Sequence, residues 1–295
     1  MKKITVILFC ALLLISAGCS DAKTNVSNSS EALLTVNGKA ITNGNVYRAL
    51  SSSGNITPVL DAIEKQVVSK AVKVTDEMEE NAKATLETTK KNVGAENWNN
   101  YIKESGFKDE DDYYKNSILL ELRAEKLTET YINENFSNLV KQYEVKKLQI
   151  MLATTEKEAD AKKALKKKNA DFKAIAKEYG IESAYDGSEA IYTNQSGLPT
   201  AVWNNILKTE DGKVADTVLD QTTGNLYIVK VVSSEAKDFK EETIAAIKNI
   251  TTQNEEGLTI DEIAFNYYLN KAGFEIHDAD IYTLLLNNSK KYQED

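Results

Sequence analysis

The sequence predicts an α+β protein in which both ends of the chain form one mainly helical body and a small antiparallel sheet is inserted between them. From residue 145 to residue 232, short apolar runs alternate with helical patterns. On either side of this stretch, apolar residues recur at the spacing of amphipathic helices. Neither flank is rich enough in apolar residues to close a core alone. We therefore expect the flanks to pack on each other, with connections to the insert near Tyr143 and Ser233.

The first half of the insert predicts a strand followed by two helices. Residues 146–152 form a short apolar run without Gly or Pro, which is typical of a strand. Thr155 precedes Glu158 by three positions, the spacing of a capping box, so a helix should start there. Apolar residues at 172, 175, 176 and 179 form one helical stripe. Gly180 then stands where a left-handed residue is expected to end the helix.

The second half of the insert predicts one helix and two strands. Leu198-Pro199 opens the helix, because proline suits the first helical position. Glycine-containing turns at Gly212 and Gly224 precede apolar runs at 213–218 and 226–232, which we interpret as strands.

Four segments of the insert resemble the parvulin domain of peptidyl-prolyl isomerases. They are Leu148–Leu152, Asp171–Tyr179, Gly212–Val214 and Gly224–Lys230, and they occur in the family's order. The resemblance implies a domain over residues 144–234. It also implies a site with two histidines on the central strands, an acid or cysteine beside them, and a Met/Phe pocket for proline.

The resemblance places Gln149 and Tyr227 at the two histidine positions. The family's Ser-x-Asp segment is replaced by residues 180–183. Gln149 and Tyr227 could hydrogen-bond to each other across the strands. We interpret the domain as architecture kept after catalysis was lost. An active prolyl isomerase is the alternative.

Apolar residues remain at the positions that the resemblance assigns to the proline pocket. Leu198 and Val202 stand where the family has Met and Phe, and Trp203 is adjacent. Together with Met151 on the first strand, they are the candidate contacts for proline or for an unfolded client.

The N-terminus resembles a bacterial lipoprotein signal over residues 1–18. A positive start at residues 1–3 precedes an apolar run from Ile4 to Ile15, and small residues stand before Cys19. The resemblance implies cleavage before Cys19, a lipid (palmitate) on its sulfur, and the extracytoplasmic face of a Gram-positive-type membrane. Ordinary secretion is the alternative. Polar residues from 19 to 31 predict a flexible tether.

Composition excludes several function classes. The 295 residues carry a formal net charge of −9, which disfavours nucleic acid. We interpret the basic run Lys162–Lys168 as a solvated helix face. Cys10 falls in the predicted signal, and the single histidine, His277, leaves no multi-histidine metal site. We expect no metal and no cofactor.

The flanks predict a hairpin and helices. Residues 32–42 contain an Asn-Gly pair and should form the hairpin, and Phe274–His277 should form a strand that pairs with Leu33–Val36. Residues 32–143 and 235–295 should together make the helical body. Its aromatic residues suit either a core or a client-binding surface; these are Trp98, Tyr101 and Phe107.

The amino-acid sequence of the hairpin from Val36 to Thr42 resembles the start of the PrsA and SurA families of exported folding factors. The whole chain, from signal to C-terminal helices, resembles a PrsA-type foldase lipoprotein. This implies a chaperone that works without ATP on newly secreted proteins, and it suggests a homodimer. A transporter's solute-binding lipoprotein is a further alternative, which requires two α/β lobes.

Overall fold

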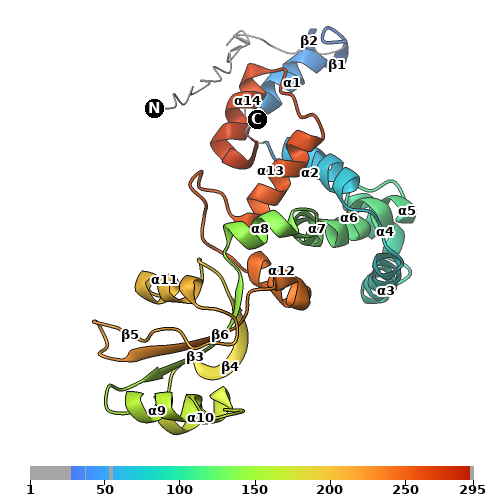
Figure 1. The fold of residues 1–295 in the computed structure, drawn as a ribbon. Helices are drawn as coiled ribbons and strands as arrows, with labels where there is room; N and C mark the ends of the chain where they lie inside the picture. The colour runs from blue at the N-terminus through green and yellow to red at the C-terminus, as the bar shows by residue number, and fades with distance from the viewer. Residues whose placement is uncertain (1–27, 37, 53–55, 293–295) are drawn as a thin grey trace, which may run out of the picture. The chain divides into compact units, whose positions relative to one another are not determined.

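A computed structural model describes residues 28–36, 38–52 and 56–292 (Figure 1). The chain divides into two compact units. One contains the residues up to Gln66 and those from Leu269 onward, and the other is Val67–Tyr268. Small antiparallel sheets and many helices give the α+β class that the sequence predicts.

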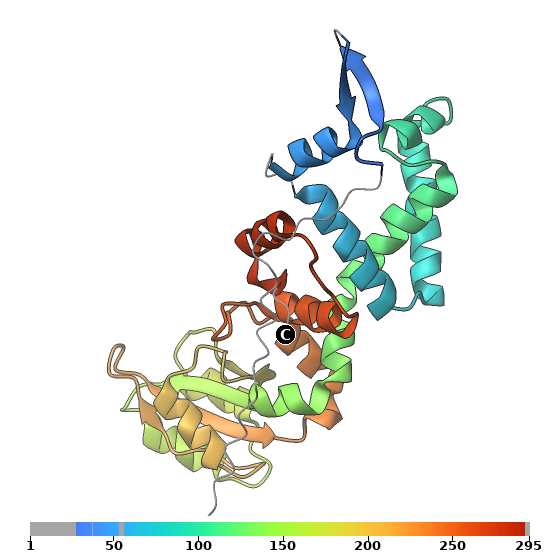
Figure 2. The same ribbon diagram turned by 90° about the horizontal axis from the view of Figure 1, so that it is seen from above.

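In the first unit, residues from both ends of the chain meet. Strand β1 (Ala32–Val36) pairs with β2 (Lys39–Thr42) in an antiparallel hairpin, drawn in dark blue in Figure 2. Helix α1 (Asn43–Ser52) follows, and α2 (Thr57–Ala71) begins in this unit. From the other end comes α14 (Ala279–Asn288), whose first turn is capped by the Asp278 carboxylate. The Tyr47 hydroxyl donates to the same carboxylate at 3.4 Å, which joins α1 to the cap of α14.

The predicted strand at Phe274–His277 is wrong. Residues 274–277 are extended but belong to no strand, and β1 has β2 as its partner in the described part of the chain. Side chains in this segment alternate between half-buried and exposed, as in a strand. In the described sheets, this segment pairs with no strand. The alternation of its side chains is therefore not accompanied by the ladder of backbone hydrogen bonds that defines a strand.

The second unit begins with a helical part. Besides the end of α2, its helical elements are α3 (Asp76–Val93), α4 (Trp98–Glu104), α5 (Glu110–Tyr113), the π-helix η1 (Tyr114–Ile118), α6 (Leu119–Glu125), α7 (Leu127–Glu134), α8 (Phe136–Gln142), η2 (Ala236–Phe239), α12 (Lys240–Lys248) and most of α13 (Ile260–Lys271). The Thr75 hydroxyl accepts from the backbone of Met78 and starts α3. Ile132 and Ile247 are fully buried where α7 packs against α12.

The aromatic residues Trp98, Tyr101 and Phe107 form one cluster through Tyr113. Trp98 is buried and stacks on Tyr101 with ring centroids 5.5 Å apart. Phe107 meets Tyr113 edge-on at 5.1 Å. These contacts favour the core role for the cluster.

The second unit also contains the predicted insert, a four-stranded antiparallel sheet of order β4-β3-β6-β5. The strands are β3 (Lys146–Ala153), β4 (Asp186–Tyr192), β5 (Val218–Leu219) and β6 (Leu226–Ser233). Helix α11 (Thr200–Lys208) covers one face, and α9 (Glu158–Leu165) and α10 (Phe172–Tyr179) cover the other (Figure 1). Each face has its own apolar core.

Strand β4 covers residues 187–191, for which the sequence analysis predicts no strand. Two local expectations for the insert are wrong. The predicted strand at 213–218 is reduced to a bridge at Val214 and the two residues of β5. Helix α9 begins at Glu158 with Lys157 at its cap, and no side chain caps it.

Gly180 also differs from expectation, since its φ of −72° is not left-handed. A Cβ at this position would lie 2.3 Å from the carbonyl oxygen of Ala176, so space is the reason for glycine. None of the helices in the described ranges combines the length and the apolar character needed to cross a membrane.

Candidate functional site

The face of the sheet under α11 carries most of the candidate residues. Leu148 and Ile150 of β3 and Val229 and Val231 of β6 form a core with Val202, Trp203 and Ile206 of α11. Leu198, Tyr185, Val218 and Tyr227 lie partly exposed at the edge of this core. We call these four residues the α11 edge.

Gln149 lies on the other face. It alternates with Leu148 and Ile150 along β3, so it points to the side of Met151, under α9 and α10. The side chain is 9% exposed, and its amide donates to the Gly187 carbonyl at 3.0 Å. Strand β4 has an irregular register between Asp186 and Glu189, and this hydrogen bond satisfies the carbonyl there. Gln149 therefore has a structural role in the bulge.

Tyr227 lies on the α11 face, half-buried beside Tyr185. The two rings meet edge-on with centroids 5.9 Å apart. Burial raises the pKa of the Tyr227 hydroxyl, and the nearby Tyr185 and Asp220 raise it further. The phenol is thus neutral at physiological pH. Because Gln149 and Tyr227 point to opposite faces, the hydrogen bond that the sequence allowed between them does not form.

The four predicted contacts for proline or client are not brought together. Met151 is fully buried among Phe172 and Ile175 on the α9–α10 face. Val202 and Trp203 lie under the α11 face, 2% and 7% exposed. Leu198 alone among the four keeps a partly open surface.

Trp203 is held by a partner outside the sheet. Its indole nitrogen donates to a Glu144 carboxylate oxygen at 2.6 Å. Glu144 joins α8 to β3 and has a φ of 49°, in the left-handed region. The contact therefore ties α11 to the point where the chain enters the sheet.

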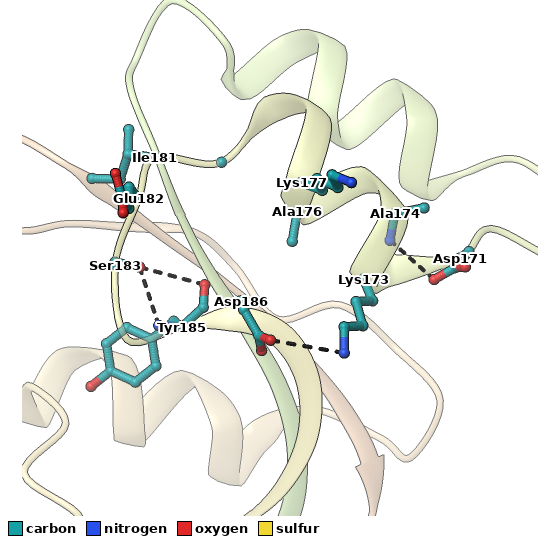
Figure 3. A pocket seen from close by; sticks show the side chains of 11 residues that line it. Asp171, Lys173, Ala174, Ala176, Lys177, Ile181, Glu182, Ser183, Tyr185 and Asp186 are labelled. Atoms are coloured by element: carbon teal, nitrogen blue, oxygen red, sulfur yellow. Dashed lines mark hydrogen bonds and ion pairs between the residues drawn. The ribbon is translucent and has the colours of Figure 1, made fainter.

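A hollow of about 610 Å³ lies beside α10 and the segment that leads into β4 (Figure 3). Its walls contain both charges, since Lys173 and Lys177 face Asp171, Glu182 and Asp186. Lys173 lies 3.9 Å from an Asp186 oxygen. The wall also contains Tyr185 and so continues to the α11 edge.

Ser183 and Asp186 in the wall of the hollow are engaged within the chain. The Ser183 hydroxyl accepts from the backbone of Tyr185 at 3.1 Å and donates to the carbonyl of the same residue at 3.4 Å. Hydrogen bonds from the backbone and hydroxyl of Ser188 lower the pKa of Asp186. Ser183 belongs to the segment that replaces the family's Ser-x-Asp, and its hydroxyl is thus engaged by the local backbone.

The profile of the PPIC-type PPIASE domain matches residues 124–243. Foldase protein PrsA from Geobacillus kaustophilus (strain HTA426) is 25% identical over 271 residues, covering 90% of this chain and 93% of that protein. The chain is similar to the PrsA-type foldases, and residues 124–243 match a PPIC-type parvulin domain. A crystal structure of PrsA from Bacillus cereus is 19% identical with a TM-score of 0.47, covering 89% of this chain and 100% of that one. PrsA from Streptococcus pneumoniae is 18% identical with a TM-score of 0.38, at the same coverage.

The similarity to PrsA-type foldases allows the site to be compared with the parvulin pattern. At the two positions where the parvulin pattern has histidine, this chain has an amide engaged in a bulge and a neutral phenol. Neither group exchanges a proton near neutral pH as an imidazole does. In the described residues, no cluster of His, Cys, Asp and Glu could hold a metal ion. The apolar surface that remains partly exposed at this site is the α11 edge.

Sequence reasoning missed Tyr185. It lies in the segment before β4, which carries no periodic signal, and its importance comes from Tyr227, 42 positions later in the chain. The half-buried pair of Tyr185 and Tyr227 at the α11 edge can be recognised only when the positions of β4 and β6 in the sheet are known.

Proposed function

We propose that the protein is an ATP-independent foldase that holds unfolded, newly secreted proteins while they fold. The observation that carries the proposal is the relationship to a PrsA foldase over 90% of the chain, together with a PPIase-type domain lacking both histidines. Such a combination favours binding of unfolded segments over catalysis on them. The exposed surface of the α11 edge is suited to weak, broad apolar contacts.

The same geometry supports the loss of isomerase activity. Rotation about an X–Pro bond faces a barrier of about 18–20 kcal/mol, and a catalyst must bind the twisted amide better than the planar one. Val202 is buried, so proline has no open pocket at that position. Gln149 points to the opposite face.

An active isomerase is the second candidate, favoured by the open surface of Leu198, Tyr185 and Tyr227. A protease-coupled or NMR exchange assay on an Ala-Pro peptide decides between the two. We expect no acceleration at catalytic protein concentrations. Acceleration that disappears in Leu198→Ala or Tyr227→Ala would establish the isomerase instead.

The foldase itself is tested by refolding a denatured secreted protein with residues 20–295 of this chain, without ATP. We expect light scattering from the aggregating client to fall. Replacing Tyr185 and Tyr227 by serine should weaken this protection several-fold, whereas replacing the exposed Tyr282 should leave it unchanged. No protection at a tenfold molar excess would refute the foldase function.

Anchoring at the outer face of the membrane through a lipid on Cys19 is a further part of the proposal. Cys19 lies outside the described residues. The support for the lipid anchor is the resemblance of residues 1–18 to a lipoprotein signal. Labelled palmitate should enter the wild-type protein and not Cys19→Ala, which should be released into the medium. Uptake of label by both would contradict the assignment.

For the domains, we propose boundaries at 32–143, 144–234 and 235–295, with a homodimer as the assembly. The transporter alternative needs two α/β lobes. The sheets of the described residues are small and antiparallel, which disfavours it.

A further inference from the structure

The outer side of α9 and α10 is strongly basic in an acidic protein. Residues 157–177 contain eight lysines and three acidic residues, a net charge of +5, whereas the whole chain carries −9. Seven of the lysines are exposed, and we call them the basic face; they are Lys157, Lys163, Lys166, Lys167, Lys168, Lys173 and Lys177.

Most of these charges are not neutralised within the protein. Lys162, outside the basic face, pairs with Glu158 at 2.6 Å, and Lys173 lies 3.9 Å from Asp186. The other six lysines of the basic face have no ion-pair partner among the residues that the structure describes. Two of the three acidic residues in this range are engaged elsewhere, since Glu158 pairs with Lys162 and Asp171 caps α10 by accepting from the backbone of Ala174.

The fold fixes where the lysines point. Ala161 and Ala164 of α9, and Phe172 and Ile175 of α10, are buried against the sheet, so the lysines occupy the opposite sides of the helices. The turn after α9 is ordered by backbone hydrogen bonds, from Lys167 to Ala164 and from Ala170 to Lys167. Asn169 completes it with a φ of 60°. This turn presents three successive lysines.

We propose that the basic face docks on the anionic headgroups of a lipid bilayer. The inference rests on the proposed function in one respect. A lipid on Cys19 and a tether of residues 19–31 would keep the body within about 20 Å r.m.s. of the membrane. At that distance a modest electrostatic attraction is enough to orient the domain, because the anchor already supplies a high effective concentration. Each lysine near an anionic surface strengthens binding about fivefold.

The shape of the surface favours a bilayer over a strand of soluble polyanion. Five of the seven basic-face lysines lie outside the hollow beside α10, and only Lys173 and Lys177 line it. The hollow also contains Asp171, Glu182 and Asp186, which disfavour a polyanion there (Figure 3). No large apolar side chain is exposed between residues 157 and 177, all of which the structure describes, so we expect adsorption without insertion.

The test uses residues 20–295, which lack Cys19, so that no lipid contributes. The protein is sedimented with vesicles of phosphatidylcholine, with or without 40% phosphatidylglycerol, at 50 mM and 500 mM salt. We expect binding to the anionic vesicles only, at least tenfold weaker at high salt. The triple variant K163E/K166E/K167E should bind at least 30-fold more weakly.

The matched control is K91E/K103E/K108E, which makes the same charge change on three exposed lysines of the helical part. It should keep most of the binding. Unchanged binding by the first triple variant, or none to anionic vesicles at low salt, would overturn the proposal. So would binding to soluble polyphosphate without binding to vesicles, which would identify a polymer as the partner.

Two further readouts separate this proposal from its alternatives. A role of the lysines in helix stability alone predicts a lower Tm for the first triple variant and unchanged vesicle binding. Client protection in solution should be the same for the wild type and both variants. Loss of vesicle binding with protection retained therefore tests the basic face, while absence of protection in the wild type counts against the foldase function alone.

Discussion

Gln149 shows how a residue at a family's catalytic position can become structural. Its amide is buried and satisfies the Gly187 carbonyl at the irregularity of β4. Gln149→Ala should lower the free energy of unfolding by about 1–3 kcal/mol, because a buried carbonyl loses its partner. Urea denaturation measures this. Gln142→Ala, at an exposed position, is the control and should change stability by less than about 0.5 kcal/mol. Equal effects of the two variants would contradict the role of Gln149.

Trp203 is the residue whose role changes most from the sequence-based expectation. It was a candidate client contact, yet it is buried and bonded to Glu144. Trp203→Phe keeps the ring in the core but removes the donor, so it should destabilise the protein by about 1–3 kcal/mol. Glu144→Gln keeps an acceptor oxygen and should cost less. Unfolding of both variants should be measured by circular dichroism, because Trp203→Phe removes a tryptophan and so changes the fluorescence signal itself. A neutral Trp203→Phe would show that the hydrogen bond to Glu144 does not contribute to stability.

At the scale of elements, the sequence predicted what local chemistry determines. Helix α11 begins directly after Pro199, so the predicted start is right to within one residue. Strands β3 and β6 are mostly apolar on both faces, since both of their faces are covered. Strand β4 was missed because Gly187, with a φ of 80°, interrupts its alternation.

The candidate site was less predictable than the fold for a related reason. A helical stripe shows which side of α11 is apolar, but not how completely the sheet covers it, so Val202 was taken for an open contact although it is buried. Likewise, the face to which Gln149 points follows from the register of β3 with β6. The sequence of β3 alone does not determine that register, because the partner strand lies far along the chain.

Asp211, whose carboxylate binds Ser234 just after β6, should make the stability of the protein depend on pH. The Asp211 carboxylate accepts from the hydroxyl and backbone of Ser234, at 2.6 and 2.9 Å. These hydrogen bonds, with Lys146 nearby, lower the pKa of Asp211. A depressed folded-state pKa gives stability that is present above the ordinary value of about 3.9 and is lost as pH falls through the folded-state value.

We therefore expect Asp211→Asn to be less stable than the wild type at pH 7 and nearly equal to it at the acid end of the titration. Urea midpoints at pH 7, 5, 4 and 3 measure the difference. Asp238→Asn, at an exposed position, should show no such convergence. A constant gap between Asp211→Asn and the wild type at every pH would show that the carboxylate's charge is not involved.

For the whole molecule, the central question is whether the two ends of the chain depend on each other. Within their unit, α1 meets the cap of α14 through Tyr47 and Asp278, and Asp278 is only 6% exposed. Leu285 and Tyr292 are buried in the same unit. The hairpin β1–β2 exposes Leu33, Leu34 and Val36, and a two-stranded hairpin alone is marginal in water.

A chain ending at Gly273 keeps α13 whole and removes α14. Hydrogen exchange should then lose its protection in α1 and in residues 57–66 of α2, because their apolar sides have no cover, while β3 and β6 stay protected. Asp278→Ala in the full chain should weaken the same protection by about 1–2 kcal/mol through loss of the cap, whereas Asp278→Asn should preserve it, since asparagine caps equally well. If α1 exchanged equally slowly in the shortened and full chains, the N-terminal segment would fold without the C-terminal helices. The helical body would then not be discontinuous.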